Sequence, residues 1–171
     1  TFSNILQFFS AISSILLAFF MIMISLFNQD VKAIIYLAGA FIAYIFNVAG
    51  LKPALGNKID LEARSSICDI VDIPVNNKFD GPNSNSVFIG FTLMYLSIPM
   101  FENNEINFPL MISILTLFGM DAIYKLNNKC TSNFGIIIGG LVGGLIGVGY
   151  YYLLTNFGLK DYTYFSQRGS N

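Results

Sequence analysis

Long apolar stretches alternate with shorter polar ones along this chain. Five stretches are apolar enough to be interpreted as membrane-spanning segments, and they cover residues 5–27, 31–51, 86–101, 108–124 and 134–154. A helix needs about 20 predominantly apolar residues to cross the hydrocarbon layer of a bilayer. The pattern therefore predicts an all-α fold. We expect a polytopic transmembrane helical bundle of about five spans in residues 1–154, followed by a polar C-terminal tail at 155–171.

The last apolar stretch carries glycine at every fourth position. Gly135, Gly139, Gly143 and Gly147 fall on one face of the predicted helix. Because glycine has no side chain, a second helix can pack against such a face at backbone distance. We therefore predict that this face is a helix-packing surface.

The longest polar stretch is the loop at residues 52–85, between the second and third spans. Its proline, glycine and asparagine content is typical of irregular structure, with one short helix expected around residues 60–66. With five spans, the N-terminus, this loop and the 126–132 turn share one side of the membrane, here called the loop side. The C-terminal tail then lies on the opposite side.

Two observations favour opposite orientations in the membrane. By the positive-inside rule the loop side is cytoplasmic, since six of the nine basic residues lie on it or at its edge: Lys52, Lys58, Arg64, Lys78, Lys125 and Lys129. Cys68 and Cys130 also lie on the loop side, so a disulfide between them is geometrically feasible. Such a bond would place that side in an oxidising compartment. The sequence leaves both orientations open.

Composition then narrows the classes of function. The chain is 54% hydrophobic and 11% charged, whereas soluble domains average about 25% charged residues. A formal net charge of −1 argues against a nucleic-acid partner, which requires a basic face. Histidine is absent and the two cysteines lack the spacing of a zinc site. We therefore expect the lipid bilayer as a partner, and neither a metal nor a cofactor.

Two polar features stand out against the apolar background. Asp121 lies well inside the fourth span, four residues before Lys125. Carboxylates within a membrane are often functional, but an i,i+4 ion pair also explains this spacing and is the preferred interpretation. Residues 81–86 open the third span with polar side chains that can cap the helix, and exposed N–H groups at a helix start can bind an anion.

Three groups of polar residues lie at the loop-side ends of the spans. In chain order they are Lys52-Pro53, Pro82-Asn83-Ser84-Asn85 and Tyr124-Lys125, the last just before the glycine-striped span. This arrangement resembles the type 2 phosphatidic acid phosphatase and haloperoxidase superfamily. That family carries three motifs. The first is a Lys followed after six residues by Arg-Pro, and the second is Pro-Ser-Gly-His. The third is Ser-Arg, followed after five residues by His and after three more by Asp. Its last motif also leads directly into a helix with glycine at every fourth position.

The match retains the two prolines and the ladder glycines but loses the catalytic residues. In this register Thr131 replaces the nucleophilic histidine, Asn85 the acid histidine, Gly135 the orienting aspartate and Ile45 the first lysine. An amide does not titrate and this threonine has no adjacent base, so the family's phosphohistidine chemistry is not expected. What the resemblance still implies is a residual phosphate or lipid-headgroup site formed by Lys52, Asn83, Ser84, Asn85 and Lys125.

The predicted function is that of a catalytically inactive, multi-pass membrane protein with a structural or scaffolding role. Loop 52–85 and the C-terminal tail would contact other membrane or capsid-type proteins, as in a viral envelope, a virion inner membrane or a membrane derived from the endoplasmic reticulum. One alternative is a lipid-phosphate phosphatase with altered catalytic residues, drawn from Cys68, Cys130, Thr131, Asp69, Asp72 and Asp80. The other is a small channel or transporter with a water-lined path past Asp121.

Overall fold

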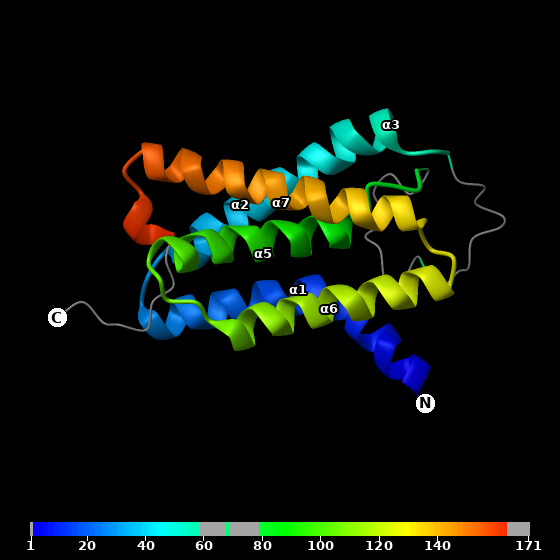
Figure 1. Ribbon diagram of the computed structural model, residues 1–171, viewed down its shortest axis with the longest axis horizontal. Helices are drawn as coiled ribbons and strands as arrows, with labels where there is room; N and C mark the ends of the chain where they lie inside the picture. Colours follow the sequence, from blue (N-terminus) through cyan, green and yellow to red (C-terminus); the bar gives the residue numbers. More distant parts are fainter. Residues whose placement is uncertain (1, 59–67, 69–78, 164–171) are drawn as a thin grey trace.

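Five long helices make up most of the computed structural model, which describes residues 2–58, 68 and 79–163 (Figure 1). They are α1 Phe2–Asn28, α2 Lys32–Phe46, α5 Ser84–Glu102, α6 Phe108–Asn127 and α7 Asn133–Asn156. Three short helical segments complete the described part: the π-helix η1 Asn47–Leu51, α3 Lys52–Leu55 and the 3-10 helix η2 Lys160–Tyr162. The fold is an all-α bundle, as the apolar pattern predicts.

Within the described residues, four helical segments are long and apolar enough to cross a membrane. They are Lys32–Leu55, Ser84–Glu102, Phe108–Asn127 and Asn133–Asn156, and a shorter apolar helix covers Ile12–Asn28. These lengths and compositions fit an integral membrane protein with several spans.

Several predicted boundaries differ from the structure, and α6 also continues beyond residue 124 to Asn127. Helical structure continues beyond residue 51 to Leu55. Pro53 lies in the first turn of α3, where helices tolerate proline because the N–H that it lacks is not required there. The third span is longer than predicted, since it starts at Ser84 and keeps Pro99 within the helix. The polar loop is therefore shorter than 52–85 at both ends. The short helix expected around residues 60–66 lies outside the described residues.

The α5–α7 pair forms the centre of the bundle, and the two helices run side by side in Figure 1. A Cβ atom at Gly147 would lie 2.6 Å from the carbonyl oxygen of Phe91, and one at Gly143 would overlap the carbonyl oxygen of Val87. Gly139 faces Asn83 and Ser86 in the same way. The glycine face of α7 is therefore in backbone contact with α5.

An aromatic core joins α2 to this pair. The rings of Phe91 and Tyr95 stack with centroids 5.6 Å apart, and Tyr36 and Tyr150 pack against both of them. The Tyr36 hydroxyl also shares a hydrogen bond of 2.7 Å with Thr92. On the other side of α5, α1 and α6 pack against each other, so that the bundle has a second pair of helices.

The first part of the predicted polar tail forms regular structure that packs against the bundle. After α7 the chain turns at Gly158 and forms η2, and Thr163 is fully buried. Lys160 pairs with Glu102 at the end of α5 at 3.0 Å, and Glu102 accepts a hydrogen bond from Tyr151. This contact fixes the first part of the tail at the end of the bundle opposite the loop side.

Candidate functional site

Asn83 joins the start of α5 to two other helices. Its backbone is extended, and its side-chain oxygen accepts a hydrogen bond from the Ser86 N–H, as expected of an N-cap asparagine. The same oxygen accepts a hydrogen bond of 3.0 Å from Lys125 Nζ on α6. The backbone N–H of Asn83 donates to the carbonyl oxygen of Gly135 on α7 at 2.9 Å. Two of the predicted site residues, Asn83 and Lys125, are therefore in direct contact.

Lys125 is fully buried and its charge is balanced within its own helix. Its ammonium lies 3.4 Å from Asp121 Oδ2, and the two side chains are 0% and 1% exposed. The i,i+4 ion pair predicted from the spacing is confirmed. An unpaired charge in this environment would carry a large desolvation penalty, so each partner keeps the other in place.

The second oxygen of Asp121 faces α1. Asp121 Oδ1 accepts hydrogen bonds from Ser10 Oγ at 2.6 Å and from Asn85 Nδ2 at 3.2 Å. The Asn85 amide also donates to Ser13 Oγ, and its oxygen accepts from Ser14 Oγ at 2.7 Å. We call these residues the buried polar cluster: Ser10, Ser13, Asn83, Asn85, Asp121 and Lys125. Through it α1, α5 and α6 share one hydrogen-bond network.

Ser84 and Lys52 lie at the same end of the bundle as this cluster. Asn47, the first residue of the π-helix, donates from Nδ2 to the carbonyl oxygen of Pro82 at 3.1 Å and to Ser84 Oγ at 3.3 Å. Lys52 is buried in α3, and its carbonyl oxygen accepts from the Gly56 N–H. These contacts join Asn83 to Lys125 directly and Asn85 to Lys125 through Asp121, while Ser84 bonds to Asn47 of η1.

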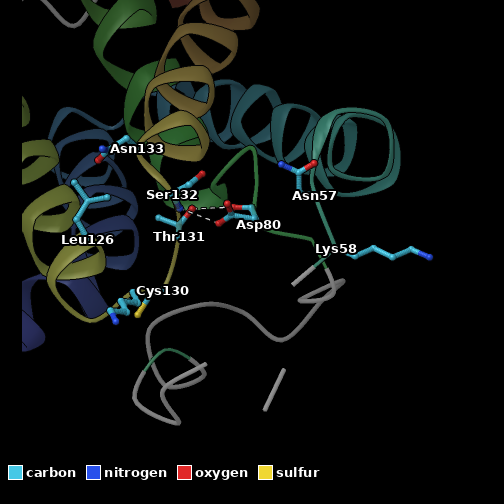
Figure 2. Close-up of a pocket in the computed structure, with 9 residues that line it drawn as sticks. Asn57, Lys58, Asp80, Leu126, Cys130, Thr131, Ser132 and Asn133 are labelled. Atoms are coloured by element: carbon cyan, nitrogen blue, oxygen red, sulfur yellow. Dashed lines mark hydrogen bonds between the residues drawn. The ribbon is translucent and has the colours of Figure 1, made fainter. Parts of the chain in front are cut away.

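Thr131 and Asp80 form a second polar site at the start of α7 (Figure 2). Thr131 Oγ1 donates to the carbonyl oxygen of Asp80, and Asp80 Oδ1 accepts from the Ser132 N–H, both at 2.8 Å. The carboxylate thus occupies the N-terminal end of α7, where an external anion would otherwise be favoured. The Thr131 hydroxyl donates to a carbonyl and not to a base, so it lacks the activation that a nucleophile needs.

An open cavity of about 670 Å³ lies beside this second site. Its lining residues are Asn57, Lys58, Asp80, Leu126, Lys129, Cys130, Thr131, Ser132 and Asn133. Two lysines and one carboxylate share the opening, so their charges partly cancel.

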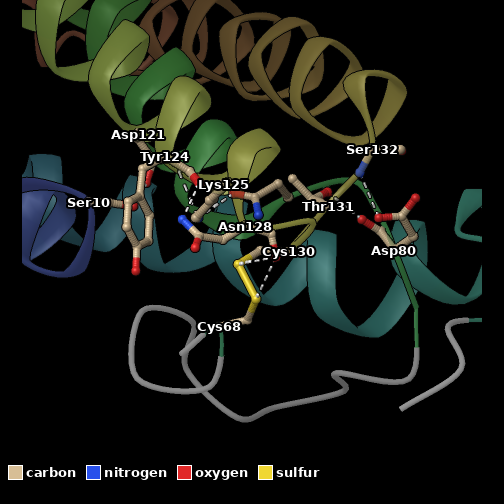
Figure 3. Close-up of a disulfide and its surroundings, with 11 residues drawn as sticks. Ser10, Cys68, Asp80, Asp121, Tyr124, Lys125, Asn128, Cys130, Thr131 and Ser132 are labelled. Carbon is tan, nitrogen blue, oxygen red and sulfur yellow. Dashed lines mark hydrogen bonds and ion pairs between the residues drawn. A yellow bond between two sulfur atoms is a disulfide. The ribbon is translucent and has the colours of Figure 1, made fainter. Parts of the chain in front are cut away.

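A disulfide joins Cys68 of the loop to Cys130 of the α6–α7 turn, with the Cα atoms 5.4 Å apart (Figure 3). Neither cysteine is free, so neither thiol is available as the nucleophile of the alternative phosphatase. Of the acids considered for that role, Asp69 and Asp72 lie outside the described residues, and Asp80 is engaged at the start of α7.

Sequence reasoning missed the contribution of α1 to the site. Ser10, Ser13 and Ser14 follow an i, i+3, i+4 spacing in a largely apolar helix, which places them on one face. That spacing is the signal that could have identified them as partners of a polar group on another span. Asn47 carries a weaker signal, as an amide near the end of an apolar stretch.

Comparison of the chain with protein-family models, with curated proteins and with solved structures finds no match. The resemblance to the phosphatase superfamily therefore stays a prediction from the sequence motifs.

Proposed function

We propose that this membrane protein is catalytically inactive and has a structural role, in which the buried polar cluster holds its helices together. One observation carries the proposal. Lys125, the residue that the family resemblance assigns to phosphate binding, is fully buried and engaged by Asp121 and Asn83.

The energetics of this ion pair support a structural role for Lys125. A phosphate could recruit the Lys125 ammonium only by displacing the Asp121 carboxylate, which would then remain buried beside a second anion. Breaking a buried ion pair by removing one partner typically costs about 3–5 kcal/mol. The headgroup site predicted at Lys52, Asn83, Ser84, Asn85 and Lys125 is therefore less favoured than a network that stabilises the fold.

Two further contacts support a scaffold that presents its loop. The disulfide attaches the loop at Cys68, and the Asp80–Ser132 hydrogen bond attaches it near its end. Both anchors lie on the α6–α7 turn or the start of α7, so the loop is tied to the membrane domain at two places. We propose that this loop and the C-terminal tail contact partner proteins on opposite sides of the membrane, and that a capsid-type protein beneath a viral membrane binds only the segment on its own side.

Phosphate release from phosphatidic acid and from undecaprenyl pyrophosphate tests the proposed inactivity. The full chain, purified in mild detergent, should release no more phosphate than a buffer blank. Release by the wild-type chain that disappears in a folded Lys125→Ala variant would show that Lys125 serves catalysis and would overturn the proposal.

Cross-linking in the native membrane tests the scaffold. A lysine-reactive cross-linker should join this side of the protein to a second protein, through Lys58 of the loop or Lys129 of the α6–α7 turn. A chain that cross-links only to itself would contradict the scaffolding role while leaving the question of catalysis to the phosphate assay.

A further inference from the structure

A groove opens between α1, α2 and α5, separate from the cavity beside Asp80. Its volume is about 670 Å³, within the range of about 300–1,000 Å³ that is typical of small-molecule sites. Around its mouth Ile15, Ile34 and Phe41 are each more than 60% exposed. Ile34 and Phe41 belong to a helix long and apolar enough to cross a membrane, and Ile15 belongs to the apolar helix beside it, so the groove opens sideways toward the hydrocarbon layer.

Small side chains create this groove. Ala18 on α1 and Ala38 and Ala40 on α2 lie where the two helices face each other. Larger residues at these positions would fill the space and bring apolar side chains into contact, as in a normally packed interior. The helices therefore leave room for another apolar group of molecular size.

The groove is apolar along most of its length and polar at one end. Tyr44 lies near the loop-side end of α2, and Ser84 and Asn85 lie at the loop-side start of α5. Ile34 and Leu37, in contrast, lie in the half of α2 that is farther from the loop side. Within the described residues, the lining contains no charged side chain.

Ser84 retains a hydrogen-bond donor at this polar end. Its Oγ accepts a hydrogen bond from Asn47, and its hydroxyl hydrogen donates to no group among the described residues. A hydroxyl can donate one hydrogen bond, so this one can serve an uncharged acceptor such as an ester carbonyl.

We propose that the groove binds one acyl chain of a membrane phospholipid, with the ester carbonyl beside Ser84 and the hydrocarbon between α1 and α2. A phospholipid in this leaflet has the same polarity profile, with its ester group near the membrane surface and its chain directed inward. A helix of a second copy fits less well. It is about 10 Å across with its side chains, so a cavity of this volume would hold less than two turns of it.

Retention of lipid by variants with a filled groove tests the assignment. The full chain is reconstituted into vesicles of dioleoylphosphatidylcholine, extracted in mild detergent and weighed by native mass spectrometry. The wild-type chain should retain a single phospholipid. Ala38→Phe should reduce the retained fraction about tenfold, because the ring occupies space that several methylene groups would otherwise fill.

Ala49→Phe is the matched control, since Ala49 is an exposed alanine of the same membrane span but does not line the groove. It should retain lipid like the wild-type chain. If Ala38→Phe does not fold by circular dichroism and size exclusion, Ala18→Phe fills the groove from the opposite wall. Equal lipid retention by the folded groove variant and the control would show that the lipid is bound only at the general surface, and would overturn the proposal. A wild-type chain that carries no lipid would also overturn it, as would a wild-type chain that forms a lipid-free dimer.

Discussion

At the scale of single residues, the side chains of the buried polar cluster bind one another. Asp121 divides its two oxygens between Lys125 on its own helix and Ser10 on α1. Asn85 uses both its amide hydrogens and its oxygen on partners in α1 and α6. A polar network that is satisfied in this way specifies one arrangement of helices, since any shift would leave a buried group without a partner.

Removing one charge of the ion pair should therefore be costly. We expect Asp121→Asn to lower the free energy of unfolding by about 3–5 kcal/mol, because Lys125 would remain buried without a counter-charge. The thermal midpoint in detergent measures this loss. Asp161→Asn, an exposed aspartate in η2, is the control and should leave the midpoint unchanged.

The double variant Asp121→Leu/Lys125→Met distinguishes the contribution of charge balance to stability from that of the hydrogen bonds that Asp121 makes to other helices. Removing both charges should recover most of the stability, since an apolar pair of similar volume often replaces a buried ion pair at little cost. A double variant as unstable as Asp121→Asn would show that the hydrogen bonds of Asp121 to Ser10 and Asn85, and not the charge balance, hold the helices.

At the scale of the elements, the periodicity of the sequence predicts a contact only where the two residues that make it are close in the chain. The spans, the glycine face and the Asp121–Lys125 pair follow from local periodicity, which a sequence displays directly. The Ser10–Asp121 hydrogen bond joins residues 111 positions apart, and the Thr131–Asp80 bond joins residues 51 apart. Such contacts depend on how the helices assemble, so the serine spacing of α1 indicates a polar partner but does not identify Asp121 as that partner.

The α5–α7 contact gives a prediction at this scale. Gly143→Ala should destabilise the bundle by about 1–3 kcal/mol, because the added methyl group would overlap the carbonyl oxygen of Val87, which is backbone and cannot rotate away. Gly149 lies in the same helix with nothing within 4 Å of a Cβ atom. Gly149→Ala should leave stability equal or raise it by up to about 1 kcal/mol, since alanine favours a helix over glycine. Equal thermal midpoints for the two variants would contradict the packing of this face.

At the scale of the whole molecule, the disulfide bears on the orientation in the membrane, for which the sequence alone gives two opposite indications. Disulfides form and persist in oxidising compartments and are rare in the cytosol. The Cys68–Cys130 bond therefore favours a loop side that faces away from the cytosol, against the positive-inside tendency of its six lysines and arginines.

Protease protection in microsomes checks this orientation. A tag at the C-terminus should be digested from the cytosolic side, because η2 and the end of α7 lie at the end of the bundle opposite the loop. The loop should be protected until the membrane is permeabilised. A protected C-terminal tag together with free, alkylatable cysteines would reverse the assignment.

Reduction should also loosen the fold. Without the Cys68–Cys130 bond the unfolded chain gains conformational freedom, and a disulfide of this span typically contributes about 2–4 kcal/mol. We expect a lower thermal midpoint for Cys68→Ser/Cys130→Ser than for the wild-type chain in the absence of reductant. With reductant the two midpoints should coincide, whereas a difference that persists would assign the effect to the substitutions themselves.

The same bond closes a covalent ring that runs from Cys68 through α5 and α6 to Cys130. Both membrane-crossing helices of the ring are therefore held at each end, by the short turn between them and by the pair of sulfurs on the loop side. A single break in the peptide chain anywhere in this ring releases no fragment. The protein can be cut there and still remain one covalent molecule.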